Sequence, residues 1–220
     1  MAGLVLPIIS SCARSPWFKA TRDLTTAYGD HEGRLTPVIF ERAIADEYRV
    51  LRTQAGIFDV PERPLEIRGP GAAAFLDFVF TRKVSTMAVD RGRYGLMCHD
   101  DGGIACDGVV FRLAEDWFWY VHADRDVFTW LNALKVGHDV EIRDPQAWAI
   151  QIQGPNSLDI LDACVDGGAP EGFKYYHARQ VTVGGQSVLI SRTGWTGELG
   201  FEVYNMDPNV DGLALWSHLM

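Results

Sequence analysis

The sequence predicts an α+β fold, in which antiparallel sheets carry helices packed on one face. Two observations point to this class. Short apolar strands joined by glycine turns alternate with stretches of helical periodicity along the chain. In addition, one strand–Gly-Pro–helix unit occurs twice with the same spacing, at residues 67–77 and 152–162. Two copies do not make a solenoid, so we expect two α+β lobes of related construction.

The composition restricts the classes of function. The chain has 220 residues, of which 47% are apolar and 22% charged, as in ordinary globular proteins. The formal net charge of −9 argues against a nucleic-acid partner, which needs a basic face. The four cysteines lack C-x-x-C spacing and the six histidines lack H-x-x-H spacing. We therefore expect thiols in a reducing, cytoplasmic setting and no metal site.

The N-terminal region begins with an apolar segment, residues 2–9, that no Lys or Arg precedes. A secretory signal normally has a basic start, so this segment is interpreted as a leader of the fold, with export as the alternative. No apolar run is long enough to span a bilayer, and no membrane partner is expected. Residues 10–36 are mostly polar without a clear period, so we expect extended chain and loop.

Residues 44–142 are predicted to form one antiparallel sheet with its helices. A helix is expected at residues 44–51, ended by Gly56, and a new segment begins at 57–60 before a turn between Pro61 and Pro64. Strand, helix, hairpin, strand, helix and strand follow at residues 65–68, 72–81, 92–113, 117–121, 124–134 and 140–142. The order β-α-β-β-β-α-β is that of an antiparallel sheet with helices on one face.

The second half begins with the second strand–Gly-Pro–helix unit. A strand is expected at residues 148–152, and Asn156 is a suitable N-cap for the helix that follows. A hairpin pairs residues 180–183 with 188–191 across Gly184-Gly185. A strand at 201–204 precedes a final helix from Leu213, which has no stop signal before the chain ends.

The hairpin at residues 92–113 carries the first candidate functional side chains. Its turn, His99–Gly103, has the Asp and Gly content of a tight connection. Tyr94 lies on the first strand, and Asp107 lies on the second among apolar neighbours. A lone carboxylate is costly to bury unless it is paired or used. Asp107 is therefore either a functional group or a strand-edge residue that faces water.

A second candidate stretch is rich in glycine. Residues 191–204 read SRTGWTGELGFEVY and include Trp195, Glu198 and Glu202. Glycine at this density allows the backbone to approach another group closely. The alternative is an ordinary glycine-rich connection between two strands.

These residues together resemble the glycine cleavage T-protein (aminomethyltransferase) family. That family includes dimethylsulfoniopropionate demethylase and the folate domains of sarcosine- and dimethylglycine-oxidising enzymes. The matching motifs occur in the family's order: AGIFDV at 55–60, IRGP at 67–70, RYGL at 93–96, GGI at 102–104 with Asp107, QGP at 153–155 and SRTGWTGE at 191–198. The resemblance extends from about residue 49 to the end of the chain.

The resemblance implies a folate-binding aminomethyltransferase-like fold, with a tetrahydrofolate pocket at the centre of a multi-lobed ring. It implies a discontinuous, truncated folate-binding lobe at residues 1–60 and 145–220, interrupted by a ferredoxin-like α+β lobe at 61–144. Family members are longer and carry a C-terminal β-domain. We therefore expect this chain to be an N-terminal fragment that lacks that domain.

By position, the resemblance implies roles for six side chains. Asp107 is the expected catalytic residue, and the expected cofactor-binding residues are Tyr94, Tyr175, Trp195, Glu198 and Glu202. Glu202 matches the carboxylate that holds the pterin, and Trp195 stands where the family usually has Tyr. The chemistry is consistent, because a carboxylate accepts the adjacent N–H donors of a pterin edge and an aromatic ring packs on a flat ligand. A carboxylate beside the folate nitrogen would stabilise the positive charge that grows there.

Three departures from the family pattern bear on the substrate. Pro61–Pro64 replaces Ser-His-Met-Gly, Cys106-Asp107 replaces an Asp-Asp pair, and residues 122–125 replace Asn-Ala-Ala-Asn. The resemblance places these positions where the aminomethyl arm or the methyl donor sits. The departures therefore favour a methyltransferase or demethylase over glycine cleavage.

The expected function is a tetrahydrofolate-dependent aminomethyl or methyl transferase. Its expected partner is a small-molecule donor or a lipoyl carrier protein. One alternative is a non-catalytic folate-binding scaffold, against which Asp107 and the motif at 191–198 argue. Another is the folate domain of a flavin-linked amine oxidase, although the chain has no dinucleotide fingerprint.

Overall fold

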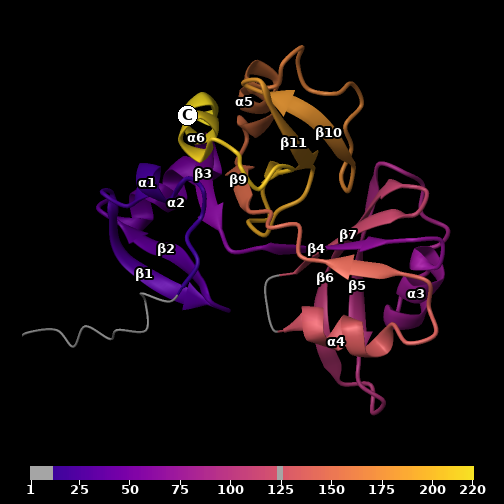
Figure 1. The fold of residues 1–220 in the computed structure, drawn as a ribbon. Helices are drawn as coiled ribbons and strands as arrows, with labels where there is room; N and C mark the ends of the chain where they lie inside the picture. Colours follow the sequence, from indigo (N-terminus) through magenta and orange to yellow (C-terminus); the bar gives the residue numbers. More distant parts are fainter. Residues whose placement is uncertain (1–11, 123–125) are drawn as a thin grey trace, which may run out of the picture.

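The computed structural model describes residues 12–122 and 126–220 (Figure 1). The expected leader at residues 2–9 and the expected start of a helix at Asp124 lie outside these ranges. The helices are α1 (Phe18–Thr21), α2 (Ile44–Thr53), α3 (Ala72–Val79), α4 (Val127–Leu134), α5 (Ser157–Cys164) and α6 (Gly212–Leu219). The strands are β1 (Thr25–His31), β2 (Arg34–Phe40), β3 (Gly56–Val60), β4 (Arg63–Arg68), β5 (Arg91–Cys98), β6 (Ile104–Ala114), β7 (Trp117–His122), β8 (Glu141–Arg143), β9 (Ala149–Gln153), β10 (Ala178–Val183), β11 (Gln186–Ser191) and β12 (Gly200–Asn205).

The middle of the chain forms the first of two five-stranded antiparallel sheets, in the order β5-β6-β7-β4-β8. The predicted order β-α-β-β-β-α-β is confirmed. One face of this sheet packs on α3 and α4, where Phe75 and Leu131 meet Leu65 and Phe118 in a buried cluster. The helices therefore cover the outer face, as Figure 1 shows for α3 and α4 at the lower right.

The second sheet has the order β10-β11-β12-β9-β3, and its pairings are also antiparallel. Its outer face packs on α5 and α6, which contribute Leu161 and Leu215 to a buried cluster with Ile152 and Val203. The hairpin predicted across Gly184-Gly185 is present as β10 and β11.

The two sheets follow the same plan. In each, a strand (β4 or β9) leads through Gly-Pro into a helix, and the third strand after that helix returns beside it. Gly69 and Gly154 both adopt φ +124, where other residues are strained. A Cβ at either position would lie 2.6 Å from a main-chain oxygen of a neighbouring segment. The repeated motif in the sequence thus corresponds to a repeated local structure.

The inner faces of the two sheets pack against each other. Phe111 and Trp119 of the first sheet form one buried cluster with Leu189 and Tyr204 of the second. The rings of Trp119 and Tyr204 meet edge to face, with centroids 6.2 Å apart. Because side chains alternate between the faces of a strand, every second residue of β6, β7, β9 and β12 points into this junction.

The polar stretch at residues 10–36 differs from the expectation of extended chain and loop. It contains α1, β1 and the start of β2, and β1 pairs with β2 around Glu32 and Gly33. Both turn residues have positive φ, 51° and 77°, as in the tight turns that suit β-hairpins. The prediction was wrong because most of β1 is half-buried or exposed, so its sequence lacks the apolar alternation of a core strand.

Two helix boundaries also differ from the prediction. Helix α2 ends at Thr53, and Gly56 begins β3 instead of ending the helix. Asn156 occupies the N-cap position of α5, but its side chain makes no capping hydrogen bond. Side-chain caps are instead made by Asp126 on α4 and Asp211 on α6, each accepting a main-chain N–H at 3.0 Å.

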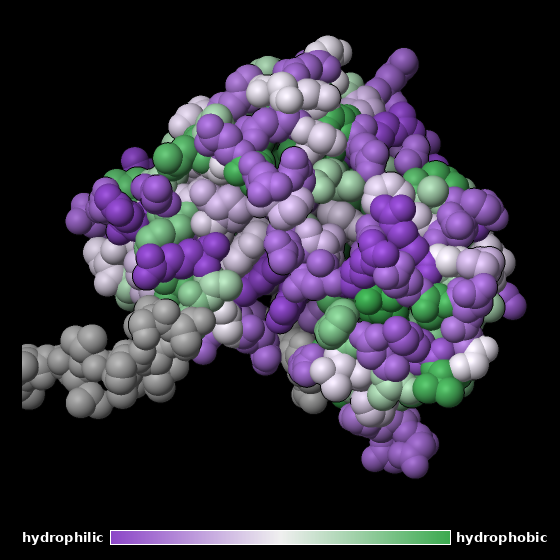
Figure 2. All heavy atoms as spheres, in the orientation of Figure 1, coloured by the Kyte–Doolittle hydropathy of each residue, from purple (hydrophilic) through white to green (hydrophobic). Residues whose placement is uncertain are grey.

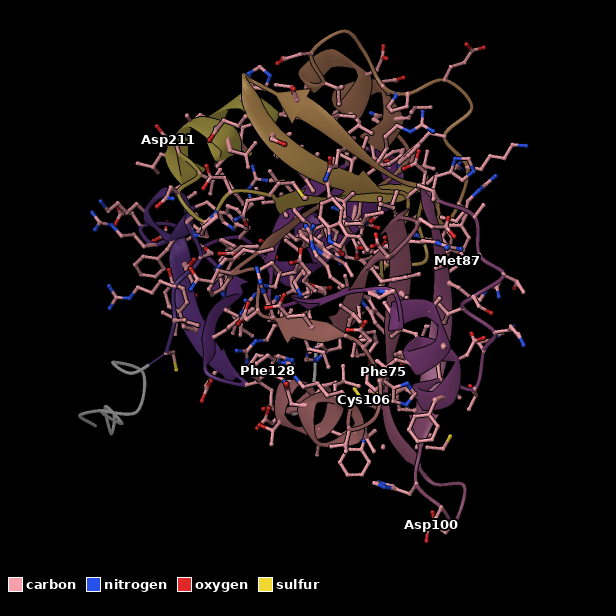
Figure 3. All side chains as sticks on the ribbon, turned by 45° about the vertical axis from the view of Figure 1, so that its right-hand side comes forward. Phe75, Met87, Asp100, Cys106, Phe128 and Asp211 are labelled. Carbon is pink, nitrogen blue, oxygen red and sulfur yellow. The ribbon has the colours of Figure 1, made fainter. Side chains whose placement is uncertain are left out.

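The face drawn in Figure 2 carries few extended apolar features. Figure 2 shows polar side chains over most of this face, with apolar ones in small separate patches. In the described ranges, no helix is long and apolar enough to cross a membrane. The β5–β6 hairpin extends from the body, with exposed Asp100 at its tip (Figure 3).

Candidate functional site

A cavity of about 370 Å³ lies at the junction of the two sheets. The first sheet contributes Tyr94, Val109 and Val121 to its wall, and the glycine-rich loop contributes Thr193, Gly194, Trp195 and Gly197. Tyr175, Tyr176, His122, Gly108 and the carboxyl residues Glu62 and Glu202 complete the lining. The wall therefore combines aromatic rings with two acidic groups, which suits a flat ligand with polar edges.

Glu202 lies on β12, on the inner face of the second sheet. Its Oε1 accepts a hydrogen bond from Gln151 Nε2 at 2.8 Å. Its Oε2 accepts from the Tyr204 hydroxyl at 2.6 Å, from the Ser191 hydroxyl at 3.2 Å and from the Thr193 hydroxyl. Burial raises the pKa of Glu202 above its ordinary value, and these hydrogen bonds oppose the rise.

Glu62 lies in the short connection between β3 and β4, and only 5% of it is exposed. Its Oε1 accepts from the same Gln151 Nε2, at 2.8 Å. Its Oε2 is buried and has no hydrogen-bond partner within residues 12–122 and 126–220. Burial, followed by the charge of Glu202, raises the pKa of Glu62 to about 8. Sequence reasoning missed this residue; the available signal was an acidic residue in a turn that departs from the family pattern.

Asp107 faces the junction from the opposite side. Cys106, labelled in Figure 3, packs in the outer core with Phe75, so the next residue points to the inner face. The carboxylate is not alone as the sequence suggested, because the Tyr94 hydroxyl donates to Asp107 Oδ2. This hydrogen bond is the main cause that raises the pKa of Tyr94. Asp107 itself does not line the cavity. It is hydrogen-bonded to Tyr94, which does.

The glycine-rich loop approaches a single buried side chain, Gln153 of β9. Gln153 Nε2 donates to the Thr193 carbonyl at 3.1 Å, and the Thr196 hydroxyl donates to Gln153 Oε1 at 2.8 Å. A Cβ at Gly194 or Gly200 would lie within 2.2 Å of Gln153 Oε1. The glycine density predicted that the backbone of this loop approaches another group closely. That approach is present, and the group is the side-chain amide of Gln153.

The structure brings some of the predicted site residues together and separates others. Tyr94, Tyr175, Trp195 and Glu202 line one cavity, and Asp107 adjoins it. Glu198 does not line the cavity and forms an ion pair with Arg52 of α2. Side chains that the sequence did not single out also line it, namely Glu62, His122, Tyr176 and Thr193.

Comparison with known proteins identifies the family of this chain. Residues 17–220 match the family described as the GCVT N-terminal domain. The chain belongs to this family. The aminomethyltransferase of Alkaliphilus oremlandii is 34% identical over 214 residues, which cover 94% of this chain and 57% of that protein. The aminomethyltransferase of Streptomyces avermitilis is 39% identical over 180 residues, which cover 79% of this chain and 48% of that protein.

A solved structure shows the same fold at lower identity. The glycine cleavage system aminomethyltransferase T from Bartonella henselae matches with a TM-score of 0.84 at 23% identity, over 95% of this chain and 57% of that one. This confirms the predicted aminomethyltransferase-like fold. The chain spans about half the length of the curated relatives it matches, 57% and 48% in the two cases above.

Membership of the GCVT N-terminal domain family confirms the resemblance read from the sequence motifs. The roles of individual side chains in this member stay predictions. Glu62, for which the sequence predicted no role, lies within Pro61–Pro64, the segment that the resemblance contrasts with Ser-His-Met-Gly. Glu62 is buried and its carboxyl group lines the cavity.

Proposed function

We propose that this chain is the N-terminal part of a tetrahydrofolate-dependent transferase of aminomethyl or methyl groups. The observation that carries the proposal is the cavity between the sheets, where two buried carboxyl groups lie beside several aromatic rings. The curated relatives named aminomethyltransferase support the transferase class. When bound, tetrahydrofolate would supply the nitrogen that accepts the one-carbon unit.

The residues present fit a pterin. The cavity of about 370 Å³ is within the range of small-ligand sites. Its wall offers carboxyl oxygens for N–H donors, and the buried Glu62 Oε2 lacks a partner in the described part of the chain. Tyr94, Tyr175 and Trp195 would cover the ring faces, where aromatic contacts favour flat ligands.

Asp107 would be the catalytic residue. A fixed carboxylate stabilises positive charge that develops next to it, and it can also receive a proton. The hydrogen bond from Tyr94 would hold this carboxylate in one orientation at the edge of the cavity. Orientation matters because much of the rate in such a transfer comes from positioning the reactants.

The proposal extends to the class of one-carbon donor. The departures at Pro61–Pro64 and at Cys106 favour a small methylated donor over an aminomethyl group on a lipoyl carrier protein. Parallel assays with tetrahydrofolate and each class of donor would separate the two. Methylated folate as the product would indicate the demethylase branch, and methylene-folate would indicate glycine cleavage chemistry.

We also propose the division into lobes that the family resemblance implies. The strands of the first sheet lie between Arg63 and Arg143, whereas β3 and β9–β12 build the second. This is consistent with a folate-binding lobe at residues 1–60 and 145–220 that contains an inserted lobe at 61–144.

The deciding experiment is calorimetry with tetrahydrofolate on the full-length protein that contains this chain. Saturable binding is expected, together with competition by other reduced folates. Absence of detectable heat or competition at millimolar ligand would remove the proposed function. Binding without turnover of any one-carbon donor would favour the non-catalytic scaffold instead.

A further inference from the structure

The two carboxyl groups of the cavity differ in their remaining capacity to accept hydrogen bonds. An ionised carboxylate offers about four acceptor positions on its two oxygens. The protein already occupies Glu202 with donors from Gln151 on Oε1 and, on Oε2, from Tyr204 and from the Ser191 and Thr193 hydroxyls, which lie 2.6 Å apart and can also bond to each other. A ligand that needs both oxygens of one carboxylate would find little room on Glu202.

Glu62 presents the opposite situation. Gln151 is its hydrogen-bond donor, on Oε1, and within the described residues Oε2 has none although it is buried. The nearby Arg34 donates to the main-chain carbonyls of Glu62 and Ala147, at 3.0 and 3.1 Å, and not to the carboxylate. A buried acceptor without a donor is unfavourable, and a ligand that donates an N–H to it would remove that cost.

Gln151 places the two carboxyl groups side by side. Its Nε2 donates at 2.8 Å to Oε1 of Glu62 and at 2.8 Å to Oε1 of Glu202. Both residues line the same cavity. A planar ligand edge that reaches one carboxyl group therefore lies next to the other.

We propose that Glu62 is the main acceptor for the two adjacent N–H donors on the 2-amino-4-oxo edge of the pterin, and that Glu202, held by the protein, accepts at most one more. The inference rests on the proposed function, because it names a further residue of the same binding site. It assigns a ligand contact to a residue that the sequence analysis did not single out.

The test compares tetrahydrofolate affinity in full-length Glu62→Gln and Glu202→Gln by calorimetry. Glu62→Gln is expected to weaken binding by about 10- to 100-fold, because an amide presents one acceptor oxygen and, unlike a carboxyl group, cannot ionise to meet two N–H donors. Glu202→Gln is expected to weaken it less. Asp59→Asn is the matched control: Asp59 is also a buried acid, 7% exposed, but it accepts from Ser15 and does not line the cavity.

A ligand change isolates the contact. A tetrahydropterin that lacks the 2-amino group should bind the wild type weakly and should bind Glu62→Gln almost as well as the wild type. Glu62→Asp, which keeps the charge on a shorter stem, gives a second comparison if Glu62→Gln melts too low. Glu62→Asp is expected to bind tetrahydrofolate with an affinity between those of the wild type and Glu62→Gln. If Glu62→Gln does not fold, the expected result is that Glu62→Asp binds a few fold more weakly than the wild type.

The outcomes separate the two levels of the proposal. If the wild type does not bind tetrahydrofolate, the proposed function fails. If the wild type binds tetrahydrofolate, and Glu62→Gln and Glu62→Asp bind it with the same affinity as the wild type, only the role of Glu62 fails. A larger loss in Glu202→Gln than in Glu62→Gln would likewise return the pterin contact to Glu202.

Discussion

At the scale of single residues, Asp107 provides a direct test of catalysis. Asp107→Asn removes the charge but keeps an oxygen that can accept from the Tyr94 hydroxyl. If the carboxylate stabilises charge on the folate nitrogen, turnover should fall by about 10²- to 10⁴-fold, with little change in folate affinity. The melting temperature should change little, because the hydrogen bond to Tyr94 is retained. Steady-state kinetics, calorimetry and thermal melting on one preparation measure the three quantities.

Tyr94→Phe is the matched control for this prediction, since it removes the hydroxyl and keeps the ring. It should lower turnover less than Asp107→Asn does, because the carboxylate remains. Unchanged turnover in Asp107→Asn, together with a lower melting temperature, would show that Asp107 is structural.

Glu62 predicts a pH dependence of stability in the ligand-free protein. Its pKa rises from an ordinary 4.5 to about 8 on folding, through burial and the neighbouring Glu202. Between these values the native state binds more protons than the unfolded state, so the free energy of unfolding falls as pH increases. Glu62→Gln removes this contribution. The melting temperature of the variant relative to the wild type should therefore increase from pH 5 to pH 9.

Thermal melts at three pH values measure this effect, and exposed Glu115→Gln serves as the control. Glu202 also has a raised pKa, through burial, so some pH dependence is expected to remain in the variant. Parallel pH profiles for the wild type and Glu62→Gln would contradict the prediction.

The site residues differed in how well the sequence could predict them. Tyr94, Trp195 and Glu202 lie in or near the quoted motifs, whereas Tyr175 lies outside them; all four line one cavity. Glu62 could not be predicted from burial, because it lies in a turn between two prolines, where acidic residues usually face water. It becomes part of the site only because Gln151, 89 positions away, brings it beside Glu202.

At the scale of elements, the strand and helix order of both sheets could be predicted because core strands and amphipathic helices have distinct periods. The hairpin β1–β2 could not, because its strands are largely outside the core. The glycine-rich loop could be predicted in part. Its close approach was predictable from Gly194 and Gly200, but the partner, Gln153, lies about 40 residues earlier in the chain.

Gly200→Ala tests how far this loop depends on Gln153. The new Cβ would lie 2.1 Å from Gln153 Oε1, so the buried amide must move away from Thr193 and Thr196. We expect a loss of about 1–3 kcal/mol of stability, as for other overpacked sites. Tetrahydrofolate affinity should also fall, because the loop forms part of the cavity wall.

Gly102→Ala is the control for this substitution. It lies in the tip of the β5–β6 hairpin with φ +87, and a Cβ there would contact nothing within 4 Å. It should cost some stability through strain and leave affinity unchanged. Chemical denaturation and calorimetry compare the two variants. Equal affinities would show that the loop does not shape the site.

At the scale of the whole molecule, the fold places the site between two similar halves. The sequence motif repeated at Gly69 and Gly154 predicted two related units, and both have the same strand plan. It could not predict that their inner faces pack together. The residues that join them, such as Trp119 and Leu189, follow the same alternation as any core strand, and alternation does not identify the partner sheet.

This arrangement predicts that a ligand in the cavity stabilises the contact between the sheets. Two main-chain hydrogen bonds cross the junction, from Gly92 N–H to the Tyr176 carbonyl at 2.6 Å and from Ala178 N–H to the Asp90 carbonyl at 3.1 Å. Exchange of these amides requires the junction to open. If a bound ligand holds both walls together, opening becomes rarer by about the ratio of ligand concentration to Kd, which is about 100-fold at 100 times Kd.

Hydrogen–deuterium exchange of the full-length protein, with and without tetrahydrofolate, measures this directly. Protection should increase at Gly92 and at Ala178 together, because they belong to opposite sides of the same junction. The Gly102 amide, bonded to His99 at 3.1 Å in the hairpin tip, should exchange at the same rate in both samples. Protection confined to one side would mean that the ligand contacts one sheet only. That result would contradict the prediction that the ligand holds the two sheets together, even if tetrahydrofolate binds tightly.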